Sequence, residues 1–191
     1  MKRKSSLIIS LGVSLLFTII ACKTPQPLEK ATEAVEIAVP FSDTRYKSDK
    51  DFFRAKQVGK SQDLATSKKI ALQNAKTELA GNIKVIIKTV TDQYTNQRTV
   101  GDKQDFENKF EQLAREVVDQ TLSDVRVIDE KIYKETDGKY SYWVSIETSK
   151  QSIIDGVEAK ISKNEKLQLD YDKKKFEEVF NSEMEKMAKG K

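Results

Sequence analysis

The spacing of apolar residues changes between residues 64–94 and residues 125–148, and this change limits the folds that the sequence can adopt. From Leu64 to Tyr94, apolar residues recur at steps of three and four, which is the period of an amphipathic helix. From Val125 to Thr148 they recur at every second residue, which is the period of a β-strand. A helix and a strand pair must pack together to bury both apolar faces. The sequence therefore predicts an α+β fold.

A turn signal divides the alternating region into two strands. Asp137-Gly138 separates residues 125–134 from residues 140–148, and this dipeptide favours a hairpin because both positions tolerate positive φ. We therefore predict an antiparallel hairpin. In the first strand, one face is expected to carry Ile128 and Ile132, and the other face Val125, Val127 and Tyr133. In the second strand, one face is expected to carry Tyr140, Tyr142, Val144 and Ile146.

Helices are expected on both sides of this hairpin. A short strand over Phe52–Val58 should precede the long helix, which Ser61 can cap and Gly81 should interrupt. A second helix, capped by Asp102 or Asp105, and a third, started by Ser149 or Ser152, follow from the same spacing. Residues 163–172 mix the two periods. The expected stripes are Phe106, Phe110, Leu113 and Val117 in the second helix, and Ile153, Val157 and Ile161 in the third.

The core is expected where the long helix meets the hairpin, with the helices packed on a small antiparallel sheet. Trp143 should point away from this core, either under the C-terminal helix or outward as a binding contact. The expected core residues are Ala71, Ala75, Leu79 and Ile83 on the helix, and Tyr142, Val144 and Ile146 on the hairpin.

The C-terminal residues 163–191 read as a charged helical extension with one narrow apolar stripe. The stripe consists of Phe176, Phe180, Met184 and Met187 at helical spacing. Such a stripe must face something, because a single helix of this kind is marginal alone in water. It either folds back on its own domain or forms a partner-binding arm, in which case these four side chains are the candidate partner contacts.

The first 22 residues combine a basic stretch, an apolar run from Leu7 to Ile20, and a small residue before a cysteine. This is the layout of a secretory signal peptide. The run holds about 14 residues where a membrane-spanning helix needs about 20. Ile19-Ile20-Ala21-Cys22 resembles the lipobox of bacterial lipoproteins, in which the cysteine sulfur receives lipid and the cysteine becomes the new N-terminus. Cys22, the only cysteine, is therefore the candidate lipidation site. The alternative is an exported or N-anchored protein with a cysteine there by chance.

These signals divide the chain into four parts. Residues 1–21 are the expected lipoprotein signal peptide, and residues 22–49, which contain all three prolines, are the expected disordered tether. Residues 50–162 should form the α+β domain, and residues 163–191 its helical extension.

Composition removes most classes of enzyme. The chain has no histidine, and lipidation would consume its one thiol, which excludes histidine-dependent triads, histidine-ligated zinc and cysteine chemistry. We find no glycine-rich phosphate loop and no calcium loop, so we expect no cofactor and no metal. A carboxylate-based glycan hydrolase remains a minor alternative.

Charge argues against a nucleic-acid partner. Removal of the signal peptide leaves 31 basic residues against 30 acidic ones, whereas nucleic-acid binding requires a strongly basic face.

The order of elements behind a lipobox resembles the LPP-twenty family of small bacterial envelope lipoproteins, whose domain also occurs in flagellar proteins of the FlgT kind. The resemblance covers roughly residues 50–150. It implies a compact α+β domain with a helix on an antiparallel sheet, an envelope-associated role and no catalytic motif. Phe52-Phe53 and the lysine-rich C-terminus depart from the pattern. The positions that carry it are Arg54-Ala55, Gly59-x-Ser61, Ala71-x-x-x-Ala75-x-x-x-Leu79-Ala80, Asp137-Gly138 and Tyr142-x-Val144-x-Ile146.

These expectations combine into one hypothesis on function. We expect a membrane-anchored lipoprotein that acts as a non-enzymatic binding or scaffolding module, with an envelope protein or a second copy as its partner. Lys23 lacks the aspartate that marks inner-membrane retention in some bacteria, so we expect the outer membrane, with the domain facing the periplasm. A self-assembling structural protein, through a sheet edge or the C-terminal helix, is the main alternative.

Overall fold

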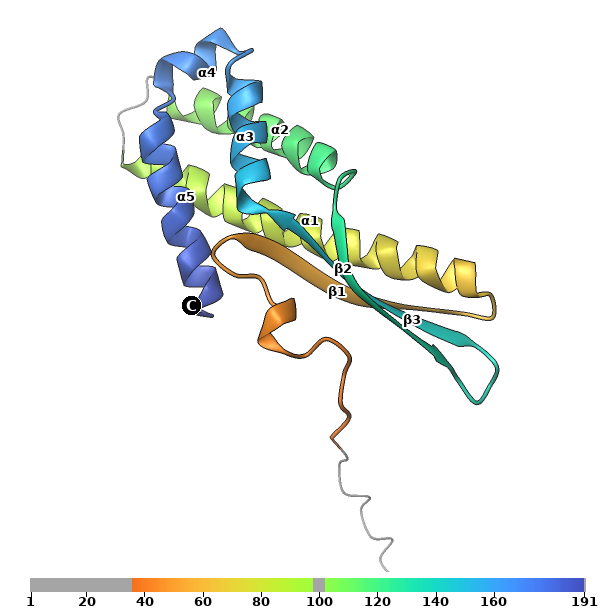
Figure 1. The fold of residues 1–191 in the computed structure, drawn as a ribbon. Coiled ribbons are helices and arrows are strands. Elements are labelled where there is room, and N and C mark those ends of the chain that lie inside the picture. The colour runs from red at the N-terminus through yellow and green to blue at the C-terminus, as the bar shows by residue number, and fades with distance from the viewer. Residues whose placement is uncertain (1–35, 98–101, 191) are drawn as a thin grey trace, which may run out of the picture. The chain divides into compact units, whose positions relative to one another are not determined.

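A computed structural model describes residues 36–97 and 102–190 of the chain. From Ile37 onward these residues belong to one compact unit that combines helices with an antiparallel sheet, so the predicted α+β class is confirmed (Figure 1). The predicted signal peptide lies outside the described residues. The elements are the short 3-10 helix η1 (Thr44–Tyr46), β1 (Phe52–Ser61), α1 (Leu64–Asn96), α2 (Lys103–Thr121), β2 (Arg126–Lys134), β3 (Tyr140–Ser149), α3 (Lys150–Ile161), α4 (Glu165–Asp170) and α5 (Lys173–Ala188).

The three strands form one sheet in the order β1-β3-β2, with both neighbouring pairs antiparallel. Directly opposed residues of antiparallel strands share a face, so the register divides the sheet into two faces. The inner face carries Ala55, Val144 and Ile146 and packs against α1. The outer face carries mainly charged and hydroxyl side chains. The core residues that we predicted on α1 and on the hairpin are all buried, which confirms this part of the prediction.

Helix α1 approaches β1 so closely that only glycine fits at the contact. A Cβ atom on Gly59 would lie 2.2 Å from the carbonyl oxygen of Ser67 and 2.5 Å from the amide nitrogen of Ala71. The hydroxyl of Ser67 donates to the carbonyl oxygen of Tyr140 at 3.0 Å, which ties the same turn of the helix to β3. The backbones of helix and strand therefore meet directly, and the fully buried Ala71 and Ala75 continue this close packing.

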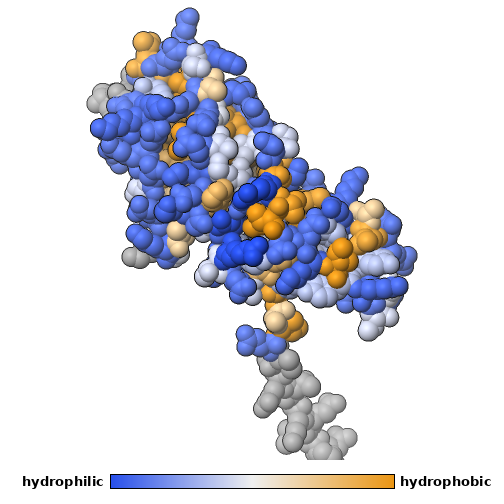
Figure 2. All heavy atoms as spheres, viewed as in Figure 1, coloured by the Kyte–Doolittle hydropathy of each residue, from blue (hydrophilic) through white to orange (hydrophobic). Residues whose placement is uncertain are grey.

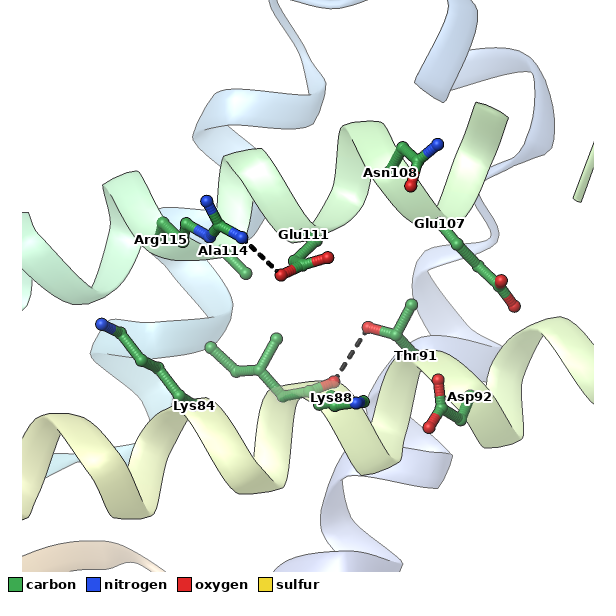
Figure 3. A pocket seen from close by; sticks show the side chains of 10 residues that line it. Lys84, Lys88, Thr91, Asp92, Glu107, Asn108, Glu111, Ala114 and Arg115 are labelled. Atoms are coloured by element: carbon green, nitrogen blue, oxygen red, sulfur yellow. Dashed lines mark hydrogen bonds and ion pairs between the residues drawn. The ribbon is translucent and has the colours of Figure 1, made fainter. Parts of the chain in front are cut away.

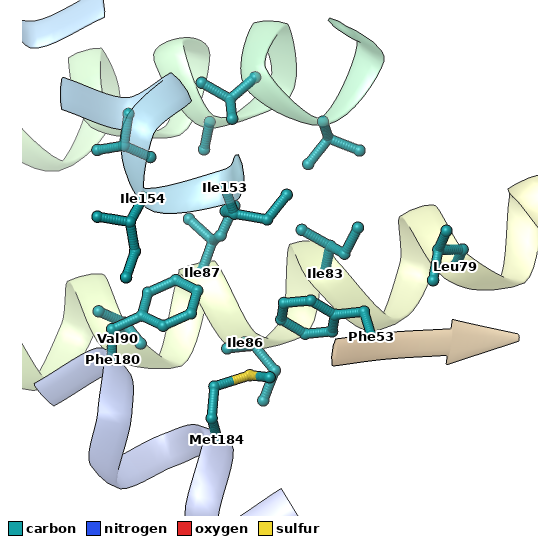
Figure 4. Close-up of a cluster of buried hydrophobic side chains, with 14 of the residues drawn as sticks. Phe53, Leu79, Ile83, Ile86, Ile87, Val90, Ile153, Ile154, Phe180 and Met184 are labelled. Atoms are coloured by element: carbon teal, nitrogen blue, oxygen red, sulfur yellow. The ribbon is translucent and has the colours of Figure 1, made fainter. Parts of the chain in front are cut away.

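The second half of α1 extends past the sheet and is covered by other helices. A helix of 33 residues is about 50 Å long, whereas a strand of ten residues spans about 33 Å. Beyond the sheet, α1 contacts α2 and α5, and α2 contacts α3. Figure 4 shows the resulting core, in which side chains of α1, α3 and α5 meet Phe53 of β1. One continuous core thus joins the sheet and the helices.

Three local details differ from the sequence predictions. Asp63 rather than Ser61 caps α1, because its carboxylate accepts a hydrogen bond from the amide of Thr66 at 2.7 Å. Gly81 does not interrupt α1, and the space around it is open. The ambiguous residues 163–172 contain the short helix α4. Of the alternative caps, Asp102 starts α2 and Ser149 starts α3.

The hairpin turn forms where we predicted it, but it has a different geometry. Glu135 donates its amide to Lys139 at 2.8 Å, and Gly138 donates to Glu135 at 3.0 Å. Gly138 has a φ of 84°, whereas Asp137 does not have a positive φ. The loop is therefore a three-residue turn with glycine in the left-handed position rather than a two-residue turn with two positive φ angles.

A β-bulge changes the predicted faces of β2. Val127 pairs with Ile146 but Asp129 already pairs with Ser145, so Ile128 is one extra residue in the strand. Val127 therefore shares the inner face with Ile132, and the prediction that it shares a face with Tyr133 is wrong.

The C-terminal stripe belongs to the core. Phe176, Phe180 and Met184 are fully buried and Met187 packs partly against them. The ring of Phe176 lies 5.4 Å from that of Phe110, between the ring centroids. Burial against α1 and α2 explains why so thin a stripe is stable. Of the two predicted alternatives, the stripe folds back on its own domain, so residues 163–191 contribute to the core and these four side chains are no longer candidate partner contacts.

We predict that Gly59→Ala lowers the free energy of unfolding by about 1–3 kcal/mol, because backbone atoms of α1 would have to move. Gly81→Ala is the matched control and should stabilise the domain by about 0.5–1 kcal/mol, since Gly81 lies inside the same helix in open space. Urea unfolding of both variants measures the two free energies. Equal stability of the two variants would contradict the close contact at Gly59.

Candidate functional site

The outer face of the sheet is built from rows of side chains that cross all three strands. Arg54 on β1 pairs with Glu147 on β3, which in turn pairs with Arg126 on β2. The next row consists of Lys56, Ser145 and Asp129 in the same order. Cross-strand neighbours on one face lie close enough for their side chains to interact.

The first row is an ion triad around a buried carboxylate, with Arg126 exposed to solvent. Glu147 is only 3% exposed, and its carboxylate accepts a hydrogen bond from Nε of Arg54 at 2.8 Å. Nη2 of Arg126 donates to the other carboxylate oxygen. A buried carboxylate is stable only where such partners compensate its lost hydration. The triad therefore depends on both outer strands being in register with β3.

A segment before β1 crosses this face, and we call residues 40–48 the strap. Phe41 and Tyr46 are buried, with 3% and 9% of their surfaces exposed. Nζ of Lys56 donates to the carbonyl oxygen of Phe41 at 2.5 Å, and the ammonium of Lys131 lies 5.4 Å from the Phe41 ring centroid. The strap thus contacts both outer strands. The prediction of residues 22–49 as a disordered tether is therefore wrong for the strap.

The sequence contained a signal for the strap that our prediction missed. Phe41 and Tyr46 are aromatic residues in a stretch that is otherwise polar or proline-containing. Phe41 has a φ of 63° and is the only non-glycine residue with a positive φ in the described part of the chain. A bulky residue keeps this unfavourable backbone conformation only where its surroundings fix it.

Asp129 of β2 holds Arg45 and Tyr46 of the strap. The hydroxyl of Tyr46 donates to its carboxylate at 2.5 Å, and Arg45 lies 3.8 Å from the same oxygen. The hydrogen bond from Tyr46 is the main reason that the pKa of Asp129 lies below its usual value. Asp49 directly follows the strap. Burial opposes ionisation of its carboxyl, but hydrogen bonds from Arg54 and from two backbone amides still lower its pKa.

Arg45 of the strap and the triad line an open recess of about 390 Å³. Arg45, Arg54 and Arg126 line it together with Glu147. Each arginine already faces a carboxylate of Asp129, Asp49 or Glu147. Because these charges balance, the recess has no excess of positive charge for an anion. In Figure 2, hydrophilic residues cover most of this view of the domain and surround small, separate hydrophobic patches.

A second hollow, of about 300 Å³, lies between α1 and α2 (Figure 3). Ile87 and Ala114 supply its apolar floor, and Thr91 turns its hydroxyl away to the carbonyl oxygen of Ile87 at 2.8 Å. The remaining lining side chains are charged or amide-bearing. We call this hollow the α1–α2 groove.

The charges of the α1–α2 groove are divided between its ends. Lys84 and Arg115 lie at one end, Asp92 and Glu107 lie at the other, and Lys88 and Glu111 lie between them. Arg115 donates to Glu111 at 2.6 Å, and this hydrogen bond lowers the pKa of the Glu111 carboxyl. The groove therefore offers an apolar floor between a basic end and an acidic end.

The carboxylates of the groove are not arranged as a catalytic pair. A glycosidase needs one carboxyl with a raised pKa to act as general acid. Glu111 is paired with Arg115, and Glu107 accepts a hydrogen bond from Thr95 at 2.9 Å and lies 3.8 Å from Lys103. The hydrogen bond from Arg115 favours the ionised form of Glu111. The carboxyl of Glu111 therefore does not have the raised pKa of a general acid.

The sequence-predicted lipidation site, Cys22, lies outside the described residues. Trp143 is half-buried on the outer face, between Val58 and Lys131 in the neighbouring strands. Within residues 36–97 and 102–190, no group of histidine, cysteine, aspartate and glutamate side chains could hold a metal ion. No helix in the described part of the chain is long and apolar enough to cross a membrane.

We predict that Tyr46→Phe raises the pKa of Asp129 toward its ordinary value of 3.8, because the hydrogen bond that favours the ionised carboxylate is lost. A lowered pKa stabilises the docked strap above the unfolded-state pKa, and this contribution is lost as the pH falls through the folded-state value. A carboxyl-detected NMR titration of both proteins measures the shift. Asp137, whose pKa is lowered by its own neighbour Lys139, is the internal control and should titrate identically.

Comparison with known proteins finds no matching family model, no matching curated protein and no matching solved structure. The resemblance to the LPP-twenty family remains a prediction from the sequence.

Proposed function

We propose that this protein is a lipid-anchored module of the bacterial cell envelope that binds a protein partner and catalyses no reaction. The observation that carries the anchor is the sequence of residues 1–22, in which a basic stretch and a short apolar run end at Ala21-Cys22. A triply acylated N-terminus would hold the protein on a membrane essentially permanently. We also propose that the lipid anchor lies in the outer membrane and that the chain is a member of the LPP-twenty family.

The chain length between anchor and domain allows the domain to reach other proteins. Fourteen residues separate Cys22 from Ile37, where the compact unit begins, and this stretch spans at most about 50 Å. The strap then holds the following residues on the outer face of the sheet. This arrangement favours a tethered binding module over a protein inserted in the bilayer.

The α1–α2 groove is the surface best suited to the partner. Its charge pattern selects a protein segment with an acidic side chain toward Lys84, a small apolar side chain over Ile87 and Ala114, and a basic side chain toward Asp92. Complementary charges of this kind set the orientation of a bound segment more than its affinity.

We predict that Cys22→Ala abolishes both lipid attachment and stable membrane retention, because the chain has no other thiol for acylation. Metabolic labelling with an alkyne fatty acid, followed by fractionation and carbonate extraction, measures both. Lys23→Ala, which keeps the thiol, should remain labelled and membrane-bound. A Cys22→Ala protein that still carries the label, or that still resists extraction, would show that the lipoprotein assignment is wrong.

We also predict that a photo-crosslinking residue in place of Asn108, in the wall of the groove, captures the partner in intact cells. Lys84→Glu should lower the yield of that product by about threefold, since it reverses the charge at the basic end. Lys69→Glu is the matched control, because Lys69 is exposed on the same helix and does not line the groove. A yield that Lys84→Glu and Lys69→Glu change equally would exclude the groove as the binding site.

A further inference from the structure

One of the two edge strands of the sheet, β2, carries three exposed apolar side chains. Among the described residues, β2 pairs only with β3, and α1 packs on β1 and β3. Ile132 is 51% exposed, and Val127 and Tyr133 are exposed to a similar extent. These are three of the nine large exposed hydrophobic residues in the described part of the chain, and all three lie on one strand. An exposed edge strand of this kind is a template for pairing with another strand.

The hairpin geometry shows which backbone groups of β2 face outward. The amide of Glu135 donates to Lys139, so the backbone groups of Glu135 point toward β3. Backbone direction alternates along an antiparallel strand, so the N–H and C=O groups of Glu130, Ile132 and Lys134 point to the free edge. Three consecutive outward residues are thus available to a new partner strand.

The side chains of the same three residues complement a second copy of β2. When two β2 strands pair antiparallel about Ile132, Ile132 of one copy lies opposite Ile132 of the other. Glu130 of each copy then lies opposite Lys134 of the other, on the same face of the sheet. Opposed apolar residues and opposed charges each stabilise a strand pair.

Neighbouring registers lack this complementarity. Pairing about residue 130, 131 or 134 places Glu130, Lys131 or Lys134 opposite its own copy, and like charges in this position are destabilising. Pairing about Tyr133 places Lys131 opposite Glu135, but it leaves Glu130 opposite Thr136 in the hairpin turn. Only Ile132 and Lys134 of the three outward residues then find a strand partner. The bulge at Ile128 limits regular pairing to the residues that follow it.

One like-charged contact in the favoured register is already neutralised within each chain. Asp129 would lie opposite Glu135 of the second copy. However, Asp129 is paired with Tyr46 and Arg45, and Glu135 lies 3.4 Å from Lys60 and accepts a hydrogen bond from Ser141.

We infer that two copies of this chain associate through their β2 strands, antiparallel and centred on Ile132, to form one continuous six-stranded sheet. Directly opposed residues of the two β2 strands lie on the same face, so the inner faces of the two copies are continuous. Both α1 helices therefore lie on the same side of this sheet. The strap of each copy lies on the other side. The contact is small and should be weak in solution, as expected for an interface of a few strand residues.

Disulfide trapping tests the position of the contact. In antiparallel strands the Cα atoms of a hydrogen-bonded pair lie about 5.5 Å apart, which a disulfide can bridge. The full chain with Ile132→Cys should give a covalent dimer on mild oxidation in membranes of expressing cells. Val85→Cys is the matched control, because Val85 is 64% exposed on α1 and should give no dimer. Absence of a dimer with Ile132→Cys, or equal dimer with both variants, would overturn the inference.

Charge reversal tests the register. Glu130→Lys and Lys134→Glu should each weaken the dimer of the full chain in detergent about tenfold, because two attractive pairs become repulsive. The double variant should restore the parental dissociation constant, measured by sedimentation. Glu130 also contacts Lys68 in its own chain, but Glu130→Lys and the double variant lose that contact equally. A monomeric parent protein, or a double variant that stays weak, would contradict pairing about Ile132.

Discussion

The close contact between Gly59 and the first turns of α1 determines how the rest of the domain is arranged. Without a side chain at this position, the helix backbone can rest on the strand, and the hydroxyl of Ser67 then reaches β3. The contact sets the direction of α1 along the inner face of the sheet. Because α1 is longer than the strands, its second half projects past them and supplies the surface on which α2 and α5 pack. Phe180 of α5 reaches back to the ring of Phe53, so the helical part and the sheet share one core.

The outer face follows a different physical rule, since charge rather than apolar area organises it. Glu147 is buried between Arg54 and Arg126, and this triad requires all three strands in register. The strap lies beside the triad and shares Arg54 with it, because the guanidinium also donates to the carbonyl oxygen of Lys47 at 2.8 Å. Strap and sheet thus stabilise each other. For a lipid-anchored protein this contact fixes the face of the domain from which the tether departs.

The two proposed interaction surfaces lie on different elements and do not compete. The α1–α2 groove uses the second half of α1, whereas the edge contact uses Glu130, Ile132 and Lys134 of β2. The strap contacts Asp129 and Lys131 on the other face of β2. A dimer formed through β2 would place two grooves on one continuous sheet assembly. Two grooves and two lipid anchors in one assembly would raise the effective concentration of a partner that has paired binding segments. The division of surfaces supports a scaffolding role for the proposed envelope module.

The sequence by itself determined which local structures form and which faces they bury. Periods of three to four and of two predicted α1 and the hairpin, and the stripe from Ala71 to Ile83 was correctly assigned to the core. Only the tertiary structure decided which surfaces cover which faces. The bulge at Ile128, the burial of Phe176 and the docking of Phe41 all depend on contacts between residues far apart in the chain. The spacing of apolar residues indicates which side chains are buried, because buried positions repeat with the period of the helix or strand. It cannot record the partner, because the same apolar stripe can pack against its own domain or against another molecule.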